Sequence, residues 1–310
     1  MTFGRVILGD NQFLGINHSS PDKALALDDK FAKPDAILEV IGWAYQAGIR
    51  DFMFTTHDRL KPVLQEIVRS HLFPDMQYIP CLPYAHKYAN SLTDGGIKAV
   101  ITDHLGGCSK RHLLGGIGRL AVGDFSAVMQ LLVEIELLMT RGLDVRGVFL
   151  QNVIFDLIVG LRGQGLLARF HRHVSERFGA TPGYITMNHP LAQRVLCDEV
   201  GIQTPWICAN FNVAGFRMNP SRDEVEASFA NGRSKNIAMS VFASGALLPE
   251  GSVEYVRDFS GVDSILFGSS RKQNIDANFA LISAKGESHR RYRRAEDGYR
   301  VTYRHLSALG

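Results

Sequence analysis

Titratable side chains recur in this sequence just after apolar runs end. His57 and Asp58 follow residues 51–54, Lys87 follows residues 77–82, and His189 follows residues 184–187. Imidazole titrates near neutral pH, so two histidines on opposite walls of one site could take a proton from one substrate atom and give one to another. A lysine with a lowered pKa could stabilise an enolate or form an imine. These residue types predict acid/base chemistry without net oxidation or reduction.

Uncharged polar residues follow the same runs and would orient a substrate by hydrogen bonds. Amide side chains end three of the runs, and one tyrosine follows another. The full set of predicted catalytic residues is His57, Asp58, Tyr84, Lys87, Gln151, Asn152, Asn188, His189 and Asn210.

Two small-residue turns near the end of the chain repeat one plan. Each turn follows an apolar run, 237–243 or 262–267, and precedes helix-patterned sequence. Backbone N–H groups and hydroxyls at the start of a helix bind phosphate or carboxylate. The predicted anion cradle therefore comprises Ser244, Gly245, Gly268, Ser269, Ser270 and Arg271.

The elements that must position these residues alternate throughout the chain. Eight predicted strands are separated by helical patterns, at residues 5–8, 51–54, 77–82, 145–150, 184–187, 205–209, 237–243 and 262–267. Strand–helix alternation of this kind predicts an α/β fold, a single (βα)8 TIM barrel, whose strand C-termini meet at one mouth. We expect the barrel to occupy residues 1–282, with a helical, glycine-rich insertion between the third and fourth strands.

Residues 283–310 form a basic tail that could lie over the mouth, contact a second subunit in a homo-oligomer, or remain solvated. The formal charge of the whole chain is only +3, which argues against a nucleic-acid partner. No apolar run has the length of a membrane span, and we expect no secretory signal before the first strand. The four cysteines show no CxxC spacing, which favours free thiols and the cytoplasm.

Five motifs spread over nearly the whole chain carry a resemblance to a known family. They are Leu8-Gly9-x-x-Gln12-Phe13-x-Gly15, Gly48-Ile49-Arg50, Met187-Asn188 with Gln193, Ser244-Gly245-x-Leu247-Leu248, and Gly268-Ser269-Ser270-Arg271 with Asn278. Together they resemble the aldo-keto reductase superfamily. The resemblance implies a barrel that holds NADPH in an extended pose, with its phosphates gripped by the loops after the last two strands.

The catalytic tetrad implied by that resemblance does not match. The family uses Asp and Tyr near the end of the second strand, Lys at the end of the third, and His at the end of the fourth. The corresponding positions here hold Met53, Asp58, Cys81 or Leu82, and Gln151. Ordinary carbonyl reduction is therefore disfavoured at this stage.

The sequence favours a lyase, isomerase or epimerase without a cofactor, acting on a small polar anionic, possibly phosphorylated metabolite. One alternative is an atypical NADPH-dependent oxidoreductase with Tyr84 or His57 as the proton donor. Another is a barrel that binds a ligand without catalysis. A divalent-metal enzyme is less favoured because HxH and HExxH spacings are missing, although ligand types are present in Asp10, His18, His57, Asp58, His86 and His189.

Overall fold

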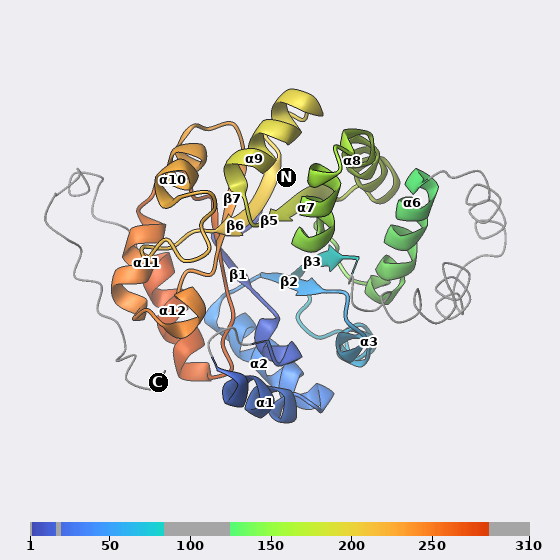
Figure 1. The fold of residues 1–310 in the computed structure, drawn as a ribbon. Helices are drawn as coiled ribbons and strands as arrows, with labels where there is room; N and C mark the ends of the chain where they lie inside the picture. The colour runs from blue at the N-terminus through green and yellow to red at the C-terminus, as the bar shows by residue number, and fades with distance from the viewer. Residues whose placement is uncertain (1, 17–19, 84–124, 285–310) are drawn as a thin grey trace, which may run out of the picture.

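The computed structural model describes residues 2–16, 20–83 and 125–284 (Figure 1). Eight parallel strands close into a barrel, each paired with the next in the chain and β8 paired with β1. The strands are β1 (Val6–Leu8), β2 (Asp51–Thr55), β3 (Gln77–Leu82), β4 (Gly147–Leu150), β5 (Thr181–Thr186), β6 (Trp206–Asn210), β7 (Lys235–Met239) and β8 (Ser264–Phe267). The predicted α/β (βα)8 fold is confirmed. The insertion and most of the basic tail lie outside the described residues.

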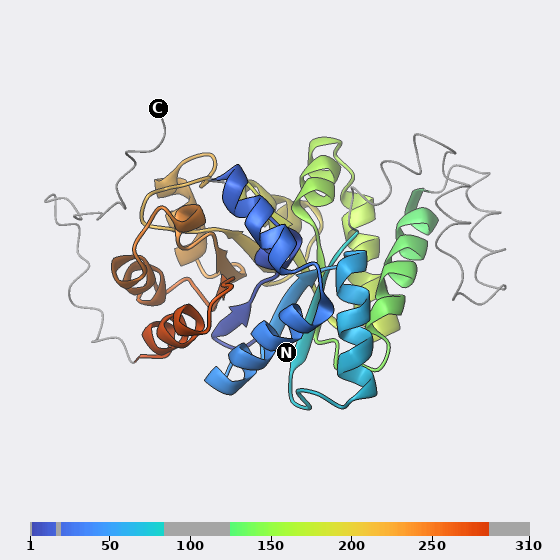
Figure 2. The same cartoon turned by 90° about the horizontal axis from the view of Figure 1, so that it is seen from below.

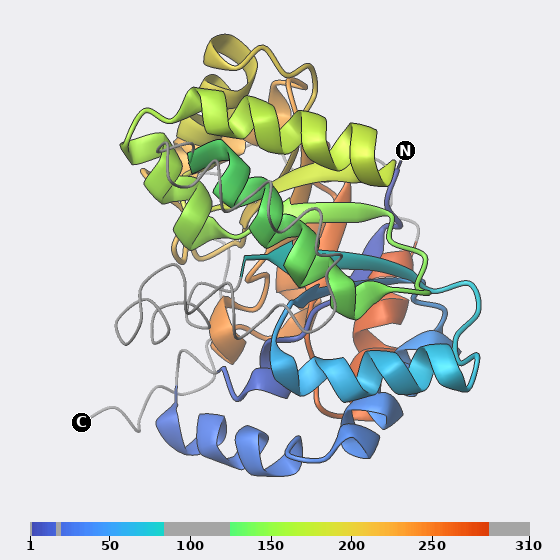
Figure 3. The ribbon, with the colours of Figure 1, turned by 90° about the vertical axis from the view of Figure 1, so that its right-hand side faces the viewer.

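Helices surround this barrel. They are α1 (Pro21–Lys30), α2 (Pro34–Ala47), α3 (Lys61–Arg69), α6 (Phe125–Glu136), α7 (Asn152–Gly160), α8 (Gln164–Phe178), α9 (His189–Arg194), α10 (Arg222–Ala230), α11 (Pro249–Arg257) and α12 (Lys272–Ser283). Helix α2 packs beside α12, and α6 beside α8 (Figures 2 and 3). No helix within the described ranges is long and apolar enough to cross a membrane.

In helix α2, local sequence determines where the helix begins, where it ends and which face is buried. Pro34 occupies its first turn, where no backbone N–H is needed. Gly48 ends it in the left-handed region, at φ 107°, which glycine adopts without steric cost. The face between these ends buries Ile37, Val40 and Ile41. Proline near the start, glycine after the end and an apolar face between them are the local signals that favour a helix here.

Two helices were not predicted. Helix α1 buries none of its residues, so it has no apolar face for a periodic pattern to reveal. Helix α7 is apolar on several sides and exposes Val153, Leu157 and Leu161 while it buries Phe155 and Ile158. Both helices belong to segments that join a strand end to the next barrel helix.

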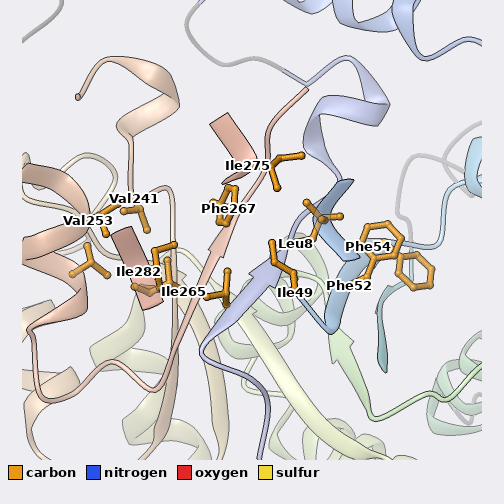
Figure 4. Packing of buried hydrophobic residues seen from close by; sticks show 14 of the residues in the cluster. Leu8, Ile49, Phe52, Phe54, Val241, Val253, Ile265, Phe267, Ile275 and Ile282 are labelled. Carbon is orange, nitrogen blue, oxygen red and sulfur yellow. The ribbon is translucent and has the colours of Figure 1, made fainter. Parts of the chain in front are cut away.

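The core has two layers separated by the barrel wall. Leu8, Phe52, Ile265 and Phe267 point outward from the strands against the helices, together with side chains such as Ile275 (Figure 4). A second set fills the barrel interior and includes Ile7, Met53, Ile79, Phe149, Cys208 and Ile237. Because side chains alternate along a strand, the residue two positions after each interior residue faces the mouth.

Glycine makes room for the aromatic residues of this interior. Gly183 pairs in register with Phe149, and a Cβ on Gly183 would lie 2.3 Å from the Phe149 ring. We expect Gly183→Ala to lower the free energy of unfolding by about 1–3 kcal/mol through overpacking. Urea denaturation measures this change. Gly165→Ala is the control, since no atom lies within 4 Å of its Cβ position; equal effects of the two substitutions would contradict the packing argument.

Candidate functional site at the barrel mouth

Side chains from three strand ends form a polar network at the mouth. Asp10 follows β1, and one of its carboxylate oxygens accepts a hydrogen bond of 2.7 Å from the backbone N–H of Thr55 at the end of β2. The Thr55 side chain also hydrogen-bonds to Asp10. Gln151, which follows β4, donates from Nε2 to the Thr55 hydroxyl at 3.3 Å. A chain of hydrogen bonds thus links β1, β2 and β4.

Burial governs the ionisation of this network. Asp10 is 7% exposed, and desolvation raises the pKa of its carboxyl from the ordinary 3.8 to about 6. Its hydrogen bonds to Thr55 oppose that shift because they favour the carboxylate. Burial also raises the pKa of the neighbouring Cys81 thiol well above its usual range, with Asp10 as a further cause. Cys81 is therefore a neutral thiol and a poor nucleophile.

The opposite side of the mouth is largely apolar. Met187 and Met239 follow the interior residues Ile185 and Ile237 by two positions, so they face the mouth. Asn210 is the polar residue among them, and its Nδ2 donates to the Arg217 carbonyl at 3.0 Å and contacts the Met187 sulfur at 3.5 Å. The mouth therefore has a polar side on β1–β4 and an apolar side on β5–β7.

The loop after β7 holds strained backbone at the predicted cradle. Ser240, Ala243 and Ser244 all have positive φ values of 57°, 45° and 59°, although none is glycine. Such conformations cost energy and concentrate at functional sites. The Gly245 N–H donates to the Phe242 carbonyl at 2.8 Å, so this amide is engaged within the loop. The loop can therefore contribute other groups to an anion, but not the Gly245 N–H.

The loop after β8 packs against a residue from the first loop. A Cβ on Gly268 would lie 2.1 Å from Oε1 of Gln12, so any larger residue at that position would force the Gln12 side chain to move. Gln12 is 6% exposed, and its Nε2 donates to the Gly9 carbonyl at 2.7 Å. Its Oε1 is buried and has no hydrogen-bond partner among the described residues. A buried acceptor left in this state is costly, which indicates a place for a donor.

Cationic groups lie beside that loop. Helix α12 begins at Lys272, and the N-cap residue Arg271 gives no side-chain capping bond, so first-turn amides remain for an anion. The Ser269 hydroxyl accepts the Arg271 N–H at 3.3 Å, which closes the turn. Lys30, at the end of α1, donates to the Ser270 carbonyl at 2.6 Å. Sequence patterns did not indicate Lys30, because α1 has no apolar face, and they indicated Gln12 only within the motif Leu8-Gly9-x-x-Gln12-Phe13.

The structure places most of the other predicted catalytic residues in loops or at the starts of helices. His57 lies in the loop after β2 and accepts the Arg59 N–H with Nδ1 at 3.0 Å, and Asp58 beside it is exposed. Asn152 begins α7, while Asn188 caps α9 by accepting the Leu191 N–H at 3.1 Å. Tyr84 and Lys87 lie outside the described residues. The predicted residues found at the mouth itself are thus Gln151 and Asn210.

His189 points away from the mouth. Its ring is 1% exposed and contacts the Ser228 hydroxyl and Oδ1 of Asn236, both at 2.8 Å, behind β7. Burial lowers its pKa to about 4, so the ring is neutral at physiological pH. Both nitrogens are engaged, and the expected pair of facing histidines, His57 and His189, does not form. The physical reason is that α9 begins at His189 and turns this side chain into the helix layer.

No cluster of three or more His, Cys, Asp or Glu side chains suited to a metal occurs in residues 2–16, 20–83 and 125–284. His18 and His86, two of the possible ligands, are outside those ranges.

Solved structures share this architecture. A glycerol dehydrogenase from Gluconobacter oxydans superimposes with a TM-score of 0.56 at 12% identity, over 92% of this chain and 88% of that one. The chain folds like an aldo-keto reductase. An aldo-keto reductase from Bacillus halodurans, in its holo form, gives a TM-score of 0.56 at 11% identity, over 92% and 89% of the two chains. No protein-family model matches the sequence, and neither does any curated protein.

The comparisons confirm the resemblance to aldo-keto reductases at the level of the fold. They overturn the preference for a lyase, isomerase or epimerase, since the structures that share the fold are named as aldo-keto reductases and a glycerol dehydrogenase, which are oxidoreductases. The preference for no cofactor is wrong for the same reason, because such enzymes normally use NAD(P)H. The missing tetrad was given too much weight.

Proposed function

We propose that the chain is an NADPH-dependent oxidoreductase that interconverts a small hydroxylated carbonyl compound and its alcohol. The observation that carries this proposal is the site where Gly268 meets Gln12. There Oε1 of Gln12, a buried acceptor without a hydrogen-bond partner among the described residues, lies against Gly268, which has no Cβ. The uncapped start of α12 is next to it. This combination suits a phosphorylated ligand with donor groups of its own.

The chain offers groups for each part of such a cofactor. First-turn amides of α12, the hydroxyls of Ser269 and Ser270, and the Arg271 guanidinium would hold phosphates. Lys30 adds a cation at the same loop. The apolar side chains Met187 and Met239 offer a surface for a flat aromatic ring. When bound, the reduced nicotinamide supplies a hydride to a carbonyl carbon.

The polar side of the mouth supports a small hydroxylated substrate. The Gln151 amide and the Thr55 hydroxyl both accept and donate hydrogen bonds, so they can orient adjacent oxygen atoms of a substrate. One structure with the same fold is named a glycerol dehydrogenase, which fits a substrate of that size. Anionic character of the substrate stays a prediction.

Titration with NADPH tests this function. We expect NADPH fluorescence to change on binding, with a dissociation constant between about 1 μM and 1 mM. Oxidised NADP⁺ should reverse the change by competition. We also expect NADPH to be consumed when DL-glyceraldehyde is added. Lack of binding up to about 1 mM would refute the proposal, and binding without turnover of any carbonyl compound would leave a ligand-binding barrel.

A further inference from the structure

Asp10 is a buried carboxyl group at the mouth of the barrel. It lies after β1, buried to within 7% exposure, and its carboxylate receives the Thr55 N–H at 2.7 Å and a bond from the Thr55 side chain. Through the Thr55 hydroxyl it is connected to Gln151. Among the ion pairs formed by the described residues, none includes Asp10.

The groups that face Asp10 leave its charge largely uncompensated. Cys81 on β3, whose pKa Asp10 helps to raise, is a neutral thiol at physiological pH. Arg59, from the loop after β2, binds the Phe13 carbonyl at 2.9 Å and Asp28 at 2.7 Å. The remaining titratable neighbours on that loop are His57 and Asp58. A carboxyl in such surroundings exchanges a proton near neutral pH, which a permanent ion pair would prevent.

We propose that Asp10 is the general acid of the reduction and the general base of the oxidation, with Thr55 and Gln151 as positioning residues. This inference rests on the proposed function. It assigns the proton transfer to a residue after β1, whereas the sequence had suggested Tyr84 or His57 as the proton donor of an oxidoreductase. The shared network of Asp10, Thr55 and Gln151 holds the carboxyl at the polar side of the mouth, where the substrate oxygen would lie.

The reaction balances with the Asp10 carboxyl group, a nicotinamide cofactor and water. In reduction, a bound reduced nicotinamide would supply a hydride, with its electron pair, to the carbonyl carbon as the C=O π bond breaks. The carbonyl oxygen gains the proton of the Asp10 carboxyl, which becomes a carboxylate. A proton from water then restores the carboxyl. In oxidation, the Asp10 carboxylate would take the hydroxyl proton, and a bound oxidised nicotinamide would accept the hydride from the carbinol carbon.

The two directions should depend on pH with opposite slopes. Because the Asp10 pKa is about 6, the acid form predominates below pH 6 and the base form above it. We expect kcat/KM for glyceraldehyde reduction with NADPH to fall above about pH 6, and kcat/KM for glycerol oxidation with NADP⁺ to rise over the same interval.

Asp10→Asn tests the assignment in the full chain. We expect kcat/KM for DL-glyceraldehyde to fall by about 100- to 10,000-fold, which is the usual contribution of acid/base catalysis, and the inflection near pH 6 to disappear. NADPH affinity should stay within about twofold, because Asp10 is at the mouth and not in the cradle. Circular dichroism checks that the variant folds.

Thr55→Val is the second variant, and its readout is the pH at which kcat/KM changes. That pH should move only if the Asp10 carboxyl group takes part in the reaction. The substitution keeps the backbone N–H but removes the hydroxyl that favours the carboxylate, so the inflection should shift to higher pH. Carbon-13 NMR titration of the Asp10 carboxyl, without cofactor or substrate, should show the same shift. A carboxyl that titrates below about pH 4 in the free protein would overturn the inference.

The outcomes separate this inference from the proposed function. If NADPH binds and glyceraldehyde is reduced, but Asp10→Asn keeps its rate and its pH profile, then Asp10 is not the acid and the oxidoreductase stands. If NADPH does not bind the native chain, the proposed function fails, and the assignment of Asp10 fails with it.

Discussion

Replacing Gly268 with valine should weaken NADPH binding by about 10- to 100-fold while the barrel remains folded. Overpacking costs about 1–3 kcal/mol, and each 1.4 kcal/mol, approximately, is a factor of ten in affinity. The Cβ alone would meet Oε1 of Gln12 at 2.1 Å. Gln12 cannot move without loss, because its Nε2 is bound to the Gly9 carbonyl. Fluorescence titration measures the change in affinity.

Two further variants test whether weaker NADPH binding would come from the clash with Gln12 or from a general loss of folding. Gly251→Ala in α11 is the matched control, since no atom lies within 4 Å of its Cβ position, and its affinity should be that of the native chain. Gly268→Ala combined with Gln12→Ala removes the clash and the unpaired acceptor together. Recovery of binding in the double variant would indicate that Gln12 only packs against the loop. Continued loss would indicate that its Oε1 contacts the ligand, and native affinity in Gly268→Val would contradict the cradle.

The strands and their ends were predictable because their signals are local. Short apolar runs followed by Gly, Ser, Asn or His mark where each strand stops, and the closed barrel then brings those ends together. Gln151 and Asn210 were placed at the mouth on this basis, and the structure places them there. The same logic failed for His189, whose orientation depends on partners far along the chain, Ser228 and Asn236.

The candidate acid and the cofactor illustrate a second limit of sequence reasoning. Asp10 was noted as a possible metal ligand, but its pKa depends on burial, which no local pattern reports. The absence of the family's tetrad was taken as evidence against redox chemistry. The residues that would bind the cofactor and the residue that would donate the proton follow different strands. A chain can therefore keep the first set while the proton donor is at another position. Here the predicted cradle residues follow β7 and β8, whereas Asp10 follows β1.

Replacing His189 with leucine should lower the free energy of unfolding by about 2 kcal/mol at pH 7 without changing kcat. The ring fills a buried site, and its loss removes one partner each from the Ser228 hydroxyl and Asn236 Oδ1. Both atoms keep another bond, from Ser228 to the Val225 carbonyl and from Ser234 to Asn236. The cost is therefore that of weakened hydrogen bonding, about 1–3 kcal/mol, and not of a fully stranded group. Urea denaturation measures it.

The difference in the free energy of unfolding between the native chain and His189→Leu should depend on pH, and this dependence tests whether the buried ring is neutral. The pKa of His189 falls from 6.5 to about 4 on folding, so the unfolded chain binds the proton more readily. The stabilisation is present above pH 6.5 and is lost as the pH falls toward 4, so the gap between native chain and His189→Leu should narrow by about 2 kcal/mol from pH 7 to pH 5. Asp10 and Asp51, whose pKa values are raised to about 6, act in the opposite direction, but they are common to both proteins and cancel. A gap that stays constant over this interval would show that the ring is not buried in its neutral form, and a fall in kcat at pH 7 would return His189 to the list of catalytic residues.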